Sequence, residues 1–190
     1  MNKIIVLVVS CLFSLSSVCL ADTLTAVDLE EVITLSPGGP ELRLKGAATK
    51  SNARQAIYVG GLYLQNDSQS VTDLLSNTGA KRFLIKTNDV VKPESIIRAI
   101  NLGITVNHTE QELNSLAGAI EEFNRIWKAE VKQGDEVFVD FTASGETQIS
   151  VNGATKGMIA GELFYRAFLK TWLGDKPLNQ DIKKQLMGAQ

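Results

Sequence analysis

The segment KSNARQAIYVGGLYL, residues 50–64, brings cations and tyrosines together where the chain becomes apolar. If residues 50–58 form one regular strand, its alternation places Lys50, Arg54 and Tyr58 on the same face. A lysine ammonium and a tyrosine hydroxyl among apolar side chains are suited to hold a carboxylate, because the exclusion of water strengthens both interactions. The segment therefore predicts the polar end of a ligand site.

The same segment has a plainer interpretation as a strand with a solvated beginning. Lys50 and Arg54 would then lie in water, and Tyr58 would belong to the core with its hydroxyl paired. The Gly60-Gly61 pair inside the strand pattern indicates a β-bulge, which would open space beside the strand. The residue pattern alone leaves both interpretations open.

Groups suited to the common kinds of catalysis are scarce in this chain. His108 is the only histidine, and it stands just before a helix cap, where an exposed polar residue is ordinary and no triad supports it. The acidic pairs Glu30-Glu31 and Glu121-Glu122 are typical of solvated faces rather than of metal ligands. No glycine-rich loop joins a strand to a helix with phosphate-binding spacing. We therefore predict no catalytic residue, no metal and no cofactor.

Apolar periodicity and turn signals predict strands that pair locally, with helices in the middle and at the end of the chain. The strands are expected from Leu42 to Lys45, ending at Gly46, and at residues 55–64, 80–87, 137–141, 147–151 and 154–159. The helices are expected at residues 71–76, from Pro93 onward, from a capping box at Thr109 to about Val131, and at residues 162–173 and 181–187. Asn152-Gly153 is the strongest hairpin signal. This order favours an α+β fold, an antiparallel sheet with helices on one face.

The first 21 residues have the pattern of a secretory signal peptide. A positive start at Lys3 precedes an apolar run to Leu20, and Cys19 and Ala21 are small enough for the positions before a cleavage site. A retained membrane anchor and a lipid-modified Cys19 are the alternatives. Cleavage would leave residues 22–190 as a single periplasmic or secreted domain, without cysteine and without a stable membrane span.

The charge of the chain bears on its partners. The formal net charge is −2, and no basic stripe with interleaved aromatic residues is present. Such a stripe is what nucleic-acid binding requires, so nucleic acid is not expected as a partner.

Several segments, taken in order, resemble the chalcone isomerase-like family, in its exported bacterial branch. They are LRLKGAATK (42–50), AIYVGGLYL (56–64), QGDEVFVDF (133–141), SVNGATKGMIAGELFYRAF (150–168) and LKTWLGDKPL (169–178). The resemblance covers most of the chain from about residue 40 onward. It implies an open-faced β-sandwich, in which a large antiparallel sheet carries helices on one face and a ligand cleft lies between sheet and helices.

The resemblance also implies roles for particular residues. The family contains isomerases that close a flavanone ring and non-catalytic members that bind fatty acids. The arginine of the family's cleft corresponds to Lys50, with Arg54 as a reserve cation, and the tyrosine that helps to hold a carboxylate corresponds to Tyr58. Tyr165, on a late helix, belongs either to the cleft wall or to the core. Because lysine cannot bind two oxygens in one plane as arginine does, binding is favoured over ring closure.

We therefore expect a non-catalytic exported protein that binds a fatty acid or a similar small amphipathic carboxylate between sheet and helices. The alternative is an isomerase or intramolecular lyase that acts on an unidentified substrate through Lys50 and Tyr58. A third interpretation is an envelope interaction module whose cleft is filled by its own side chains.

Overall fold

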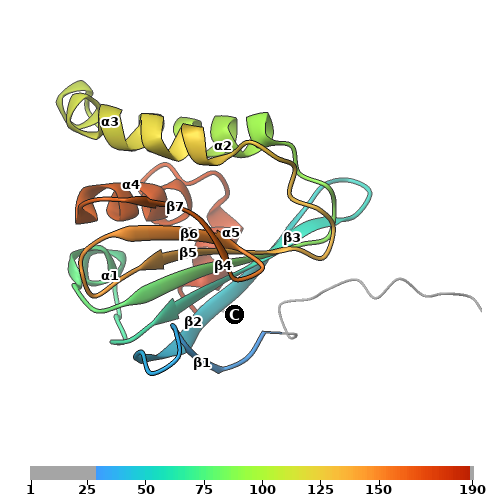
Figure 1. The fold of residues 1–190 in the computed structure, drawn as a ribbon, viewed down its shortest axis with the longest axis horizontal. Coiled ribbons are helices and arrows are strands. Elements are labelled where there is room, and N and C mark those ends of the chain that lie inside the picture. The colour runs from blue at the N-terminus through green and yellow to red at the C-terminus, as the bar shows by residue number, and fades with distance from the viewer. Residues whose placement is uncertain (1–28, 189–190) are drawn as a thin grey trace, which may run out of the picture.

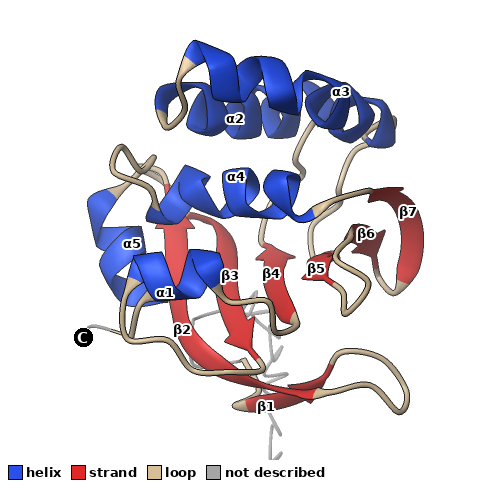
Figure 2. Ribbon diagram, turned by 90° about the vertical axis from the view of Figure 1, so that its left-hand side faces the viewer, coloured by secondary structure: helices blue, strands red, loops and turns tan. Residues whose placement is uncertain are grey.

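The computed structural model describes residues 29–188, so the predicted signal peptide at residues 1–21 lies outside the described residues. Its centre is one antiparallel sheet of seven strands, in which neighbours in sequence are also neighbours in the sheet. The strands are β1 (Val32–Thr34), β2 (Glu41–Ser51), β3 (Ala56–Leu64), β4 (Lys81–Thr87), β5 (Glu136–Phe141), β6 (Thr147–Val151) and β7 (Ala154–Ile159). The sheet curls around its helical face (Figure 2).

The helices of the described chain pack on this sheet in two layers. They are α1 (Val71–Ser76), α2 (Pro93–Val106), α3 (Glu110–Ile126), α4 (Glu162–Leu173) and α5 (Gln180–Leu186). Helix α4 lies between the sheet and the α2–α3 pair, which forms the outermost layer (Figures 1 and 2). The predicted open-faced β-sandwich with helices on one face is confirmed. No helix among residues 29–188 is long and apolar enough to cross a membrane.

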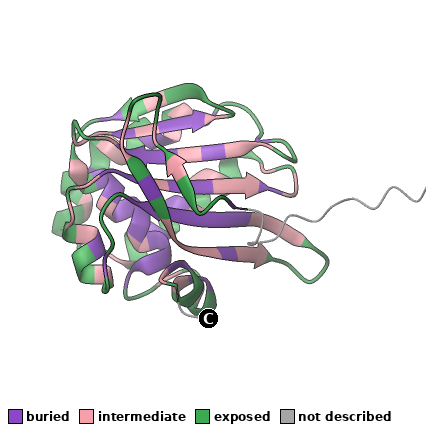
Figure 3. Cartoon of the chain, turned by 90° about the horizontal axis from the view of Figure 1, so that it is seen from below, coloured by how far each residue is buried: buried purple, intermediate pink, exposed green. Residues whose placement is uncertain are grey.

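The sheet buries apolar side chains on both faces. The larger core lies under the helices and contains Phe83, Phe168 and Trp172, which stack or meet edge to face. A smaller core on the opposite face is closed by the segment that carries β1, and its largest member is Tyr63. Strand β3 is therefore buried on both sides, and the view from below shows a continuous buried stretch along it (Figure 3).

Most predicted elements are confirmed, including the bounds of α1 and α4 and the capping box. The Thr109 hydroxyl accepts from the Glu112 N–H at 3.4 Å, and the Glu112 carboxylate accepts from the Thr109 N–H at 2.7 Å. The hairpin at Asn152-Gly153 has positive φ at both residues, 51° and 77°, as a two-residue turn between twisted strands requires.

Three predictions are wrong, two of element boundaries and one of a bulge. Strand β2 passes through Gly46 and continues to Ser51. Gly46 does not end the strand; α5 packs so closely on it that only a glycine fits there. Helix α3 ends at Ile126 rather than Val131, since Val131 pairs with Val91 in an antiparallel bridge. The Gly60-Gly61 pair forms no bulge, because both glycines keep regular register with β2 and β4; the register shifts lie at Lys45 in β2 and at Ile57 in β3.

Candidate functional site

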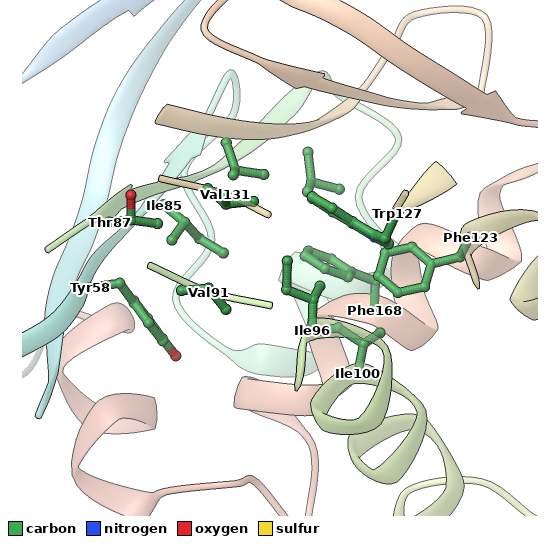
Figure 4. Close-up of a pocket in the computed structure, with 12 residues that line it drawn as sticks. Tyr58, Ile85, Thr87, Val91, Ile96, Ile100, Phe123, Trp127, Val131 and Phe168 are labelled. Atoms are coloured by element: carbon green, nitrogen blue, oxygen red, sulfur yellow. The ribbon is translucent and has the colours of Figure 1, made fainter. Parts of the chain in front are cut away.

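A cavity of about 80 Å³ lies between the sheet and the helices, where the resemblance implied a cleft (Figure 4). Strands β3, β4 and β5, helices α2, α3 and α4, and the segments after β4 and α3 form its wall. The lining residues are Tyr58, Ile85, Thr87, Val91, Ile96, Ile100, Phe123, Trp127, Val131, Val137, Val139 and Phe168. Nearly all of these side chains are aliphatic or aromatic, so the space is suited to the apolar part of a ligand.

Tyr58 and Thr87 bring hydroxyl groups to this wall. The Tyr58 hydroxyl accepts a hydrogen bond from Trp172 Nε1 at 3.1 Å, and its own proton has no acceptor among the described residues. Burial raises the pKa of Tyr58, so the phenol stays protonated and able to donate. The Thr87 hydroxyl lies 2.6 Å from the Lys132 carbonyl oxygen, to which it donates. Tyr58 is therefore a wall residue whose hydroxyl can still donate to a ligand.

Lys50 is brought beside Tyr58, although not as the sequence pattern suggested. Residues 50–58 do not form one strand, because the chain turns back near Asn52, whose carboxamide oxygen accepts from the N–H groups of Arg54 and Gln55. Lys50 on β2 is the direct partner of Tyr58 on β3, and side chains of directly opposite residues share a face. Lys50 is half-buried and is not itself part of the cavity wall.

The other two candidate ligand residues lie elsewhere. Arg54 is exposed at the tip of the β2–β3 hairpin. Tyr165 lies in the core under α4, 2% exposed, with its hydroxyl 3.4 Å from the Val139 carbonyl oxygen. Burial raises the pKa of Tyr165 well above its ordinary value. The structure thus groups Lys50 with Tyr58 and separates Arg54 and Tyr165 from both.

Sequence reasoning missed the two tryptophans that border the site. Trp172 was noted only as part of a family segment, yet it positions the Tyr58 hydroxyl and stacks on Phe83 at 4.4 Å between ring centroids. Trp127 stands in the cavity wall immediately after α3 ends. A helical pattern carries no information on the cavity that a side chain faces.

The remaining polar candidates have structural partners. His108 lies outside the cavity wall, with its Nδ1 atom 2.7 Å from the Ile104 carbonyl oxygen. Across residues 29–188 no group of three or more acidic, histidine or cysteine side chains is arranged to hold a metal ion.

Comparison with known proteins gives a family match and solved structures of similar fold. A family model described as chalcone isomerase-like matches residues 21–188. Among solved structures, the chain is similar to a fatty-acid binding protein of Arabidopsis thaliana, with a TM-score of 0.59 and 13% sequence identity over 83% of this chain and 96% of that chain. At that identity the likeness shows the fold. A search of curated proteins found no match.

Proposed function

Because the chain belongs to the chalcone isomerase-like family, we propose that it is a non-catalytic member that holds a small amphipathic carboxylate, such as a fatty acid. The observation that carries the proposal is the apolar cavity between sheet and helices, with Tyr58 in its wall. The fatty-acid binding protein of similar fold supports the ligand class. Lys50 and Tyr58 as the residues that hold the polar head stay a prediction.

The size of the cavity restricts the ligand. Its volume of about 80 Å³ is well below the roughly 300–1,000 Å³ of ordinary ligand pockets. A short acyl chain therefore suits the cavity as it stands, whereas a long chain has to displace part of the wall. The outer α2–α3 layer is the part of the wall that lies farthest from the sheet (Figure 2). We expect octanoate and decanoate to require a smaller displacement of the wall than palmitate does.

Ligand extraction tests the proposal directly. The purified full-length chain is extracted with organic solvent, and the extract is examined by mass spectrometry for bound acids. Thermal unfolding is then followed with octanoate, decanoate and palmitate, because a ligand that binds only the native state raises Tm. A cavity that is consistently empty, together with no change of Tm for any acid, would contradict the proposal.

The predicted head group contacts have their own test. If the carboxylate lies beside Lys50, as the sequence predicts, Lys50→Ala and Tyr58→Phe should weaken decanoate binding and leave decanol binding unchanged, because each removes a contact to the carboxylate. Tyr58→Phe keeps the ring that lines the cavity, so it separates the hydroxyl from packing.

We also propose that the protein is exported, as a periplasmic or secreted member of a bacterial branch of the family. The support is the secretory pattern from Met1 to Ala21. N-terminal sequencing of the chain recovered after expression with its own leader tests this. A sequence that begins at Asp22 is the expected result, and one that begins at Met1 in the cytoplasmic fraction would contradict it.

A further inference from the structure

A second and larger hollow lies on the outer side of the cavity wall. We define it as the lysine groove, a surface hollow of about 610 Å³ between the end of α3 and the β6–β7 hairpin. Trp127 and Val131 line both this groove and the apolar cavity, so these two residues are the wall between them. In the close-up, Trp127 stands on the opposite side of the cavity from Tyr58 (Figure 4).

The groove carries more cations than anions. Lys128, Lys132 and Lys156 line it and are all exposed. Within the part of the chain that the structure describes, none of the three forms an ion pair or a side-chain hydrogen bond. Three exposed ammonium groups against two carboxylates leave a net positive charge beside an apolar cavity, which favours an anion there.

The two carboxylates in the groove offset only part of this charge. Asp135 uses both oxygens for structure, because they accept from the Lys132 N–H and from Asn152 Nδ2, each at 2.8 Å. These bonds, with Asn152 as the largest cause, and the nearby charges of Lys132 and Lys156 lower the pKa of Asp135 and keep it ionised. Glu130 is exposed to solvent. The lining therefore holds three cations against two anions, which leaves a net charge of +1.

The wall between the groove and the cavity contains a buried hydrogen-bond donor that has no acceptor in the described structure. Trp127 is 8% exposed, and its Nε1 donor is buried with no partner in the described structure. Buried donors without partners are rare because the loss of hydration is not compensated. A ligand oxygen at this wall would pair with that donor. Val131, on the same wall, is fixed to Val91 by two backbone hydrogen bonds of 2.8 and 2.9 Å. The exposed residues 128–130, between Trp127 and Val131 in sequence, are therefore the part of the wall that can move.

We propose that the lysine groove binds the anionic group of the amphiphile, whose apolar chain enters the cavity past Trp127. This inference rests on the proposed function, because it requires an acyl chain in the cavity. It places the charged group at the Trp127 side, whereas the prediction from sequence places it beside Lys50. The ligand class is a single-chain anionic amphiphile longer than the cavity, with its charged end in the groove.

The test compares decanoate with decanol, its uncharged counterpart, by calorimetry on the full-length protein. The triple variant Lys128→Ala, Lys132→Ala, Lys156→Ala removes the groove cations. A second triple variant, Lys92→Ala, Lys176→Ala, Lys184→Ala, is the matched control, since these lysines are also exposed and the change of net charge is the same. The groove variant is expected to lose about tenfold in affinity for decanoate, from three exposed charge contacts, with decanol unaffected. The control variant is expected to behave as the wild type.

Each other outcome has a distinct meaning. If the groove variant binds decanoate as the wild type does while Lys50→Ala weakens it, the anionic group lies at Lys50 and the groove proposal is overturned, although the proposed function stands. Equal losses in the two triple variants would also overturn it, because net charge alone would then explain them. If the wild type binds neither decanoate nor decanol, the proposed function itself fails.

Discussion

Filling the cavity with one methyl group should stabilise the protein and weaken ligand binding at the same time. Val139 on β5 is 1% exposed and lines the cavity, so Val139→Ile extends a buried side chain toward empty space. Isoleucine is β-branched like valine and suits the middle of a strand. The change therefore tests the cavity without disturbing the sheet.

The magnitude follows from the area that the added carbon buries. One buried methylene contributes about 0.8 kcal/mol to the free energy of unfolding when it enters space that is already empty. For a domain of this size, that free energy corresponds to a rise in Tm of about 2–3 °C. The same carbon displaces part of a bound acyl chain, which should lower the affinity for decanoate by roughly fourfold.

The control is the same substitution on the other face of the sheet. Val59 on β3 is fully buried in the smaller core and lines no cavity, so Val59→Ile should overpack that core at a cost of about 1–3 kcal/mol. Thermal unfolding and decanoate calorimetry are measured on both variants. A Val139→Ile protein with lowered Tm, or with unchanged decanoate affinity, would refute the reasoning that this cavity is empty and holds the acyl chain.

Three further predictions concern stability. Gly46→Ala should lower the free energy of unfolding by about 1–3 kcal/mol, because its methyl group would collide with the α5 backbone. Gly118→Ala, on an open face of α3, should raise it by about 0.5–1 kcal/mol, and urea unfolding of both variants checks the pair. Asp140→Ala should lower the free energy of unfolding by about 3–5 kcal/mol in the same assay, because it leaves the Arg82 charge buried without a partner; Arg82 donates to both Asp140 carboxylate oxygens at 2.7 Å. A loss below about 1 kcal/mol would contradict this. Burial lowers the pKa of Lys81 from 10.5 to about 8, so the unfolded chain holds this proton more tightly and the free energy of unfolding should rise as pH increases from about 8 to 10.5, a rise that Lys81→Met should abolish.

The elements that sequence predicted best are those whose ends are fixed by neighbouring residues. Thr109 and Glu112 cap α3 through each other, and Gly174 follows α4 with its N–H bonded to the Lys170 carbonyl oxygen. Asn152-Gly153 supplies the positive φ angles of its own hairpin. In each case the deciding hydrogen bonds or dihedral angles lie within four residues, so they can be read from the sequence.

The wrong boundaries depend on residues far away in the chain. Nothing near Gly46 shows that α5, about 140 residues later, will pack on it and leave room for no side chain. Likewise, the apolar spacing of α3 continues to Val131, but the helix ends at Ile126 because Val131 forms a bridge with Val91 across the base of the α2–α3 pair. Both errors arise where tertiary packing overrides a local pattern.

Lys50 and Tyr58 lie side by side, as predicted, although the single strand from residue 50 to 58 that the prediction assumed does not exist. Even spacing along one strand would place the two residues on one face, but eight residues of strand span about 26 Å, too far for both to contact one carboxylate. The turn at Asn52 removes that distance, because residues directly opposite on adjacent strands have Cβ atoms only about 4.5–5.5 Å apart. The family resemblance, rather than the spacing, therefore carried the correct grouping, and the hairpin is what makes a shared contact physically possible. By the same reasoning, shortening the hairpin tip should leave this pair intact, whereas any change that shifts the β2–β3 register by one residue should separate it.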